Sequence, residues 1–310
     1  MRFYLDNDEV ILDHDVVSVV LRHDLVPIPV TLEMVVNAAP GIREHLGVGR
    51  TLTMATGLTL VIVKSEQYMG SKILDGYRTG AIVLTAVLSG CEQLVHVTQR
   101  AVNLKKASFA EIYRACGADV SFDTDIKVNQ FVCFKGQMAT HRISWALQKE
   151  AACIVYDVAT RRLNVKRVSE LLAQPATMYD PSSVHWLSHA HADGDIGAYH
   201  LSIDNDGTQI IGHTPDAGRM DYIPRCDARE LTNLSRILVA RGTIERAIDE
   251  RLLAGKAVLI NETTYLSVTS AISYQSGAFG GNTALSIKSW LYGLGDNNKQ
   301  RQLADTQGVQ

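Results

Sequence analysis

Apolar and polar residues alternate through much of the first hundred positions of the chain. Every even position from Ile28 to Met34 is apolar, and residues 52–62 continue the alternation around Gly57. Residues 81–88 are almost wholly apolar, as in a strand that is covered on both faces. A period of two places one side of each segment in a core. These residues therefore predict antiparallel β-sheet.

A helical spacing begins after this β-rich part. Ser108 is followed three residues later by Glu111, which is the signature of a capping box at a helix N-terminus. Apolar side chains then recur at positions i, i+3, i+4 and i+7 from Phe109 onward, and Gly117 can end the helix. We therefore expect a short helix between Ser108 and Gly117.

The rest of the chain mixes helix and strand patterns with a long stretch rich in turn residues. Up to residue 175 the patterns predict a strand over 128–136, a helix running into a strand over 139–157, a strand over 162–165 and a short helix over 168–175. Loops are expected over 176–225, followed by a helix over 243–254 that Thr243 caps and Gly255 ends. Two strands are then expected over 265–274 and 282–292, joined by the loop 276–281. The residues from Gly295 onward are polar and are expected to be disordered.

This order of patterns predicts a β-rich α+β protein. The expected units are a β-rich domain over residues 1–106, an α/β insert domain over 107–175, a loop-rich connecting region over 176–225, a second β-rich domain over 226–295 and a disordered tail over 296–310.

Composition adds one anomaly to this picture. Hydrophobic residues make up 46% of the 310 residues, which is enough for a large core and too much for a disordered chain. Charged residues make up 20%, against about 25% in an ordinary soluble domain. Because charge normally covers a free surface, we expect much of this surface to be buried in an assembly.

Several classes of protein are excluded by charge and cysteine usage. A net charge of −3 argues against a general nucleic-acid binder. No apolar run approaches the roughly 20 residues of a membrane-spanning helix, and acidic residues in "MRFYLDNDEV" stand where a signal peptide has its apolar segment. The five cysteines are far apart and include no C-x-x-C pair, which indicates free thiols in a reducing compartment.

The strongest local chemical signal is "SHAHADGDIGAYH", with His189, His191 and Asp193 in an H-x-H-x-D arrangement and His213 farther on. It resembles the zinc-ligand signature of hydrolases of the metallo-β-lactamase fold, and that resemblance implies a zinc-dependent hydrolase. The chain departs from the family because Gly194 stands where a further His is expected, and because His213 follows too soon. Nearly 190 residues without the expected βαβ order also precede the motif. The alternative is a polar surface loop whose histidines are solvated or bridge subunits. No phosphate-binding loop and no G-x-S-x-G motif is present, so no cofactor is expected.

A second resemblance covers more of the chain. The segment "SFAEIYRACGADVSF…NQFVCFKGQMATHRISWALQKEAACIVYDVATRRLNV" resembles the insert domain of tailed-phage baseplate hub proteins, a family shared with phage late control protein D and the hub half of type VI secretion spike proteins (VgrG). "GKAVLINETTYLSVTSAISYQSG" and "NTALSIKSWLYGL" are similar to the closing strands of the second barrel in that family.

This resemblance implies a structural role without catalysis. The two β-rich domains would be tube-like antiparallel β-barrels, and a homotrimer would form a pseudo-sixfold ring. That ring adapts the sixfold tail tube to the threefold central spike of a contractile injection system, and its channel serves DNA exit during genome ejection. The implied partners are the tail tube or tube-initiator protein, the spike, baseplate wedge proteins and the tape-measure protein, with no membrane and no specific nucleic acid. The implied location is the tail baseplate of a virion assembled in the host cytoplasm.

Two alternatives stay open at this stage. One is the zinc-dependent hydrolase, and the other is a different tail-tube or adaptor protein that forms a hexamer. On the hub interpretation, the Ser- and Thr-faced strands 265–274 and 282–292 are expected to pack against neighbouring subunits, the tube or the spike.

Overall fold

The computed structural model describes residues 1–37, 41–74, 77–187, 199–212, 220–236, 238–276 and 283–294. Strands dominate this part of the chain, and most of them pair antiparallel. The helices are α1 (Phe109–Ala115), α2 (Ala139–Lys149), α3 (Val168–Ala173) and α4 (Ala228–Leu234), with short 3-10 helices η1 (Arg43–His45), η2 (Glu92–Val95), η3 (Pro181–Ser183) and η4 (Glu250–Leu252). The predicted β-rich α+β fold is confirmed.

The N-terminal β-region consists of the first seven strands. They are β1 (Phe3–Tyr4), β2 (Val10–Ile11), β3 (Val16–Asp24), β4 (Val30–Asn37), β5 (Thr51–Met54), β6 (Thr59–Leu74) and β7 (Tyr77–Leu88), and their order in the sheet is β3-β4-β7-β6-β5-β1-β2. Alternate residues such as Val19, Leu32 and Leu84 point to one side and are buried there. The period of two in the sequence therefore places the core on one face of this sheet.

The insert follows as two small sheets covered by helices. Its strands are β8 (Val102–Ser108), β9 (Phe122–Thr124), β10 (Lys127–Cys133), β11 (Ala152–Asp157) and β12 (Arg162–Arg167). The capping box is present as predicted, because Ser108 Oγ accepts from the Glu111 amide and the Glu111 carboxylate accepts from the Ser108 amide. Phe109 and Tyr113 of α1 are buried in the same core that fills the N-terminal β-region.

The C-terminal β-region has its own smaller core. Its strands are β13 (Thr177–Met178), β14 (Val184–Trp186), β18 (Leu238–Arg246), β19 (Ala257–Ile260), β20 (Thr263–Gln275) and β21 (Ala284–Leu294). Pairing runs β14-β18-β21-β20, with β19 beside β20 and β13 beside β19. Ile244, Val258 and Leu291 lie at the centre of the enclosed cluster.

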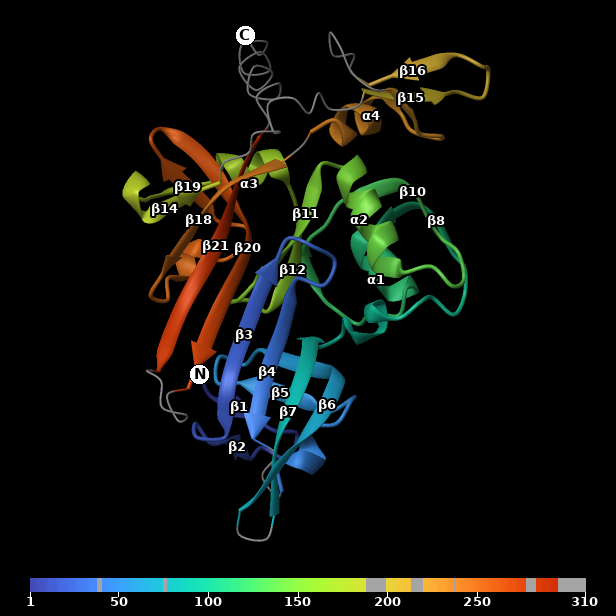
Figure 1. Ribbon diagram of the computed structural model, residues 1–310. Helices are drawn as coiled ribbons and strands as arrows, with labels where there is room; N and C mark the ends of the chain where they lie inside the picture. Colours follow the sequence, from blue (N-terminus) through green and yellow to red (C-terminus); the bar gives the residue numbers. More distant parts are fainter. Residues whose placement is uncertain are drawn as a thin grey trace.

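The two β-regions share one sheet of 13 strands, because β20 pairs antiparallel with β3. Figure 1 shows these strands side by side in the middle of the molecule. Strands that are far apart in the sequence thus join the two ends of the chain, while the insert lies between them in sequence and to one side in space.

The prediction of a helix over residues 243–254 is wrong. Residues up to Arg246 belong to β18, and only η4 is helical. Thr243 pairs with Trp290 of β21, and Ile244 is fully buried in the C-terminal core. Pairing with β21 and burial of Ile244 outweigh the local helical pattern, as tertiary contacts often do.

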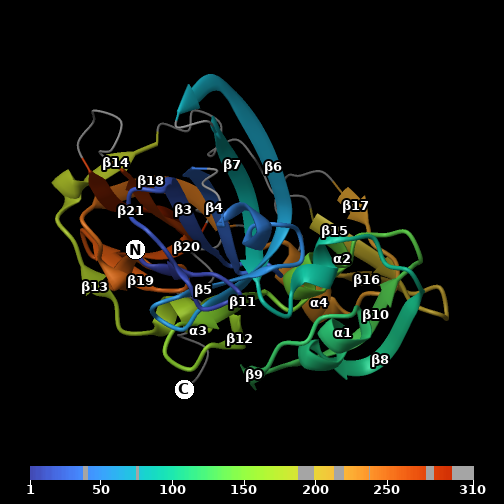
Figure 2. The same ribbon diagram turned by 90° about the horizontal axis from the view of Figure 1, so that it is seen from below.

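Residues 199–212 and 220–236 form an accessory module, where the sequence predicted loops up to residue 225 and a β-rich domain from residue 226 onward. It holds β15 (Tyr199–Ile203), β16 (Gln209–Ile211), β17 (Met220–Tyr222) and α4, and the order of the sheet is β16-β15-β17. In both views the module lies beside α2 and away from β14 and β19 (Figures 1 and 2). The expected tail 296–310 and all of the loop 276–281 except Ser276 lie outside the described residues.

Two further expectations concern the thiols and the membrane. All five cysteines lie within the described residues and are free thiols. Among the described helices none is long and apolar enough to cross a membrane.

Candidate assembly surface

One face of the 13-stranded sheet is continuous across both β-regions. Partners in an antiparallel pair point to the same side of a sheet. The register therefore places one row of side chains next to each other across β6, β7, β4, β3, β20 and β21, namely Lys64, Thr85, Glu33, Val20, Ser273 and Ser286. The neighbouring row across the same strands contains Glu66, Val83, Val35, Ser18, Gln275 and Ala284. We call these two rows, together with Arg22, Thr31, Ala271 and Lys288 beside them, the outer face.

The outer face is partly exposed and carries many small or apolar side chains. Val83 is 36% exposed, and Val20 and Val35 are half-buried. The sequence predicted that residues 81–88 are covered on both faces, whereas on the side away from the core this chain buries Val87 and leaves Val83 exposed. Exposed valines on this side are the sequence signal for a surface that contacts another molecule.

Charges on and beside the outer face are balanced and mostly paired with each other. Lys64 lies 2.9 Å from the Glu66 carboxylate, and Lys288 lies 3.3 Å from that of Glu245 on β18. The hydrogen bond from Lys64 lowers the pKa of Glu66, with a smaller contribution from Tyr68. A surface of this kind presents no excess of positive charge to a phosphate backbone.

The serines of β20 and β21 do not all lie on this face, which corrects the expectation that these strands turn their polar side outward. Ser267, Ser270 and Ser289 are fully buried. A register shift between Ser267 and Thr269 changes the phase of β20, so both of its buried serines point inward. Ser267 Oγ donates to the Leu252 carbonyl at 2.9 Å and lies 2.7 Å from Ser289 Oγ. Ser273 and Ser286 do reach the outer face, where their hydroxyl oxygens are 3.1 Å apart.

A second uncovered surface is the apolar face of the accessory module. Cross-strand pairing places four exposed apolar residues on one side of β15, β16 and β17, and these are Ile203, Ile211, Met220 and Tyr222. Helix α4 packs on the opposite side, where a Cβ on Gly212 would meet the Leu231 side chain at 2.5 Å. Nothing in the sequence pattern beyond the short apolar pair at 210–211 pointed to this face.

The β6–β7 hairpin is a third exposed feature. These two strands of 16 and 12 residues extend past the rest of the N-terminal β-region, as the lower part of Figure 1 shows. Tyr68, which is 56% exposed, pairs with Ala81 at the base of this hairpin and donates a 3.0 Å hydrogen bond to Glu66. A hairpin of this length offers backbone to a neighbouring molecule.

The candidate zinc ligands His189, His191, Asp193 and His213 all lie outside the described residues. Within the described part of the chain, no group of three His, Cys, Asp or Glu side chains is placed to hold a metal ion. The zinc-site hypothesis therefore stays a prediction from the sequence.

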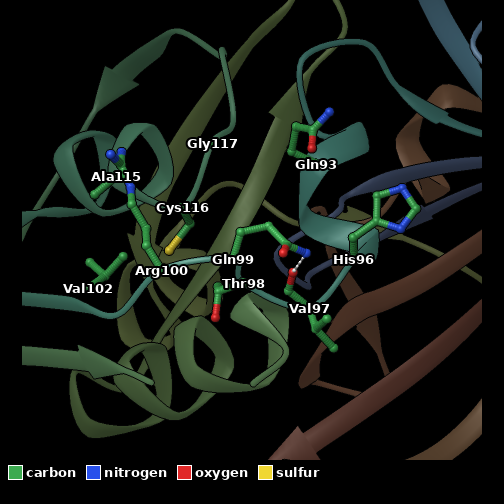
Figure 3. Close-up of a pocket in the computed structure, with 10 residues that line it drawn as sticks. All are labelled: Gln93, His96, Val97, Thr98, Gln99, Arg100, Val102, Ala115, Cys116 and Gly117. Carbon is green, nitrogen blue, oxygen red and sulfur yellow. Dashed lines mark hydrogen bonds between the residues drawn. The ribbon is translucent and has the colours of Figure 1, made fainter. Parts of the chain in front are cut away.

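A pocket of about 330 Å³ lies between η2 and α1 (Figure 3). Cys116 lines it, and burial raises the pKa of this thiol to about 12, with a further increase from the nearby Cys133. The thiol is therefore protonated at neutral pH and is a poor nucleophile. The His96 ring points away from Cys116 in Figure 3. The two residues thus do not form a nucleophile and base pair.

Comparison with known proteins finds no matching family model and no matching curated protein. Solved structures do match. The tail protein from Neisseria meningitidis MC58 has a TM-score of 0.61 at 9% identity, over 94% of this chain and 95% of that one. The prophage tail protein gp18 from Listeria monocytogenes EGD-e has a TM-score of 0.56 at 13% identity, over 98% of both chains. An E. coli component of the type VI secretion system, described as structurally similar to the T4 bacteriophage tail proteins gp27 and gp5, has a TM-score of 0.52 at 9% identity, over 89% of this chain and 73% of that one. This chain therefore shares its fold with tail and secretion proteins over nearly its whole length.

Proposed function

We propose that this protein is the structural baseplate hub of a phage tail or of a related contractile injection machine. The observation that carries the proposal is the single sheet that spans both β-regions and leaves a continuous, nearly neutral face uncovered. The shared fold with tail proteins and with a type VI secretion component supports it.

The proposed assembly is a homotrimeric ring. Each chain contributes two β-regions joined by the β3–β20 pair, so three chains supply six β-regions around one axis. Such a ring has true threefold symmetry and approximate sixfold symmetry. It can therefore contact a sixfold tail tube on one side and a threefold central spike on the other.

The outer face is proposed to form the wall of the channel. Its small neutral side chains and its paired Lys64–Glu66 and Lys288–Glu245 charges give DNA phosphates little to bind, so DNA can slide past. The apolar face of the module and the β6–β7 hairpin are proposed to contact neighbouring subunits, the tube or tube initiator, the spike or the wedge proteins. The tape-measure protein would occupy the channel before ejection.

On this proposal the protein is not an enzyme and needs no cofactor, and it is located in the tail baseplate of the virion. The proposed division of the chain is two tube-like barrel domains with an α/β insert between them. A tail-tube or adaptor protein that forms a hexamer is the second candidate, and the same tail-protein folds support it. The symmetry of the isolated particle separates the two candidates, because the hub predicts three copies and the adaptor predicts six.

A further inference from the structure

The accessory module is internally well packed. Leu231 of α4 fits directly over Gly212, where no larger residue has room. The Cys226 amide donates to Ser202 Oγ at 3.3 Å, and the Ile223 amide donates to the Leu201 carbonyl at 2.8 Å. Helix α4 and its small sheet therefore form one unit.

The contact between this module and the insert is of a different kind. None of the apolar clusters found among the described residues includes a residue of the module. Instead, polar groups meet across the contact, in the pairs Arg229–Glu150, Asn233–Lys149 carbonyl, Asn129–Asp227 and Lys149–Glu230. The contact is thus held mainly by charge and hydrogen bonds.

Glu150, at the C-terminal end of α2, lies at the centre of this contact and is only 1% exposed. Arg229 donates to both of its carboxylate oxygens, at 2.5 and 2.8 Å. Arg167 of the insert donates to the Glu150 carbonyl at 3.0 Å and to its carboxylate at 3.4 Å. A buried carboxylate needs such partners, and the module supplies the bidentate one.

The side chain of Arg229 is nevertheless about half exposed, at 47%. Water and salt ions can therefore reach one side of the pair and compete for it. Removal of the module would still leave Glu150 with Arg167 and with access to solvent. The contact is therefore strong when closed and can open without disturbing an apolar core.

We propose that residues 199–212 and 220–236 form an arm that the Arg229–Glu150 pair latches to the insert, and that the arm opens as a unit while the rest of the chain stays folded. This device does not depend on the hub function. Because the arm carries the apolar face of the module, its opening would move that face relative to the body.

The Cys226 thiol is a built-in reporter of this opening. It is buried next to Lys149 in the contact, and burial raises its pKa. The experiment measures the rate at which N-ethylmaleimide modifies each cysteine of the full-length native chain, resolved by mass spectrometry of the peptides. Cys133, which is fully buried in the insert, reports global unfolding in the same sample.

The Arg229→Gln variant should increase the modification rate of Cys226 at least tenfold and leave that of Cys133 unchanged. In the chain without substitutions, raising NaCl from 0.05 to about 1 M should also increase the modification rate of Cys226, since salt screens the half-exposed Arg229–Glu150 pair. The matched control is Arg162→Gln, which removes an exposed ion pair to Asp123 in the insert and should change neither rate. Equal rates at Cys226 in all samples, or parallel increases at Cys226 and Cys133, would overturn the proposal.

Discussion

Thr269 donates a hydrogen bond of 2.6 Å to the carboxylate of Asp24, although the two residues are 245 positions apart in the chain. The bond lies where β20 pairs with β3, which is the junction between the two β-regions. Asp24 is 9% exposed and also accepts a longer bond from Arg22. This contact ties the two ends of the chain into the one sheet on which the proposed function depends.

Replacing Thr269 by Val removes the donor and leaves a buried carboxylate without its shortest hydrogen bond. We expect the free energy of unfolding to fall by about 1.5–3 kcal/mol, the usual contribution of a hydrogen bond to a charged group. Urea denaturation of the purified chain measures it. Ser273→Ala, which removes the more exposed contact to Ser286 from the same strand, should cost clearly less. Equal losses in the two variants would show that the junction bond has no special weight.

The buried serine pair gives a second stability prediction. Ser267→Ala leaves both the Leu252 carbonyl and the Ser289 hydroxyl without a partner, so we expect a loss of about 1–3 kcal/mol. Because Ser267 and Ser289 share one bond, the Ser267→Ala/Ser289→Ala double variant should lose less unfolding free energy than the sum of the losses in the two single variants. Thermal or urea unfolding of the three variants completes the cycle. Strict additivity would contradict the shared bond.

His23 predicts a loss of stability in mild acid. Burial lowers the pKa of His23 from 6.5 to about 4, against a weaker opposing effect of Asp24. Between these values the unfolded chain binds the proton and the folded chain does not, so stability is complete above pH 6.5 and falls as pH decreases to 4. The loss should be on the order of 3 kcal/mol, from about 1.4 kcal/mol per unit of pKa.

The measurement compares the unfolding free energy at pH 7 and pH 4.5 in the unmodified chain and in His23→Gln, which should lose most of this dependence. Asp249 does not interfere with this comparison, since the hydrogen bond from Arg251 lowers the pKa of Asp249 to about 2. The Asp249 carboxylate therefore loses its contribution to folding stability only below about pH 4. A titration of the His23 ring by NMR with a midpoint near 6.5 would contradict the prediction.

The apolar face of the module makes a prediction about assembly. Ile211 is 44% exposed, so Ile211→Lys should leave the melting temperature of the chain nearly unchanged. If the face contacts another subunit, the same variant should lower the fraction of oligomer at a fixed concentration at least tenfold. Sedimentation velocity measures both species. Thr208→Lys adds the same charge in the neighbouring exposed turn and serves as the control. Identical oligomer fractions in both variants would remove this face from the interface.

Local signals in the sequence were sufficient for much of the fold. The capping box at Ser108 and Glu111 and the alternation through β4 and β21 depend on near neighbours, and the structure confirms them. The prediction of a helix over residues 243–246 failed because these residues pair with β21, some 45 residues away. A local helical pattern contains no information about that pairing. The prediction that the serines of β20 face outward failed for a similar reason. The register shift after Ser267 adds one residue to the strand, and one extra residue inverts which side chains face the core.

The candidate surface was predictable only in part. The low charge content indicated covered surface, and the apolar run at 81–88 contained the exposed Val83. The rows that join Val83, Val20 and Ser273 depend on the pairing of four strands from both ends of the chain. No local pattern encodes that arrangement.

The symmetry of the purified particle tests the hub proposal most directly. Mass photometry at nanomolar concentration and sedimentation at micromolar concentration give the mass, and class averages in negative stain give the symmetry. We predict a particle of three chains of 34.0 kDa each, seen as a ring with threefold symmetry and a central channel. A stable monomer at micromolar concentration, or a ring of six chains, would contradict the account.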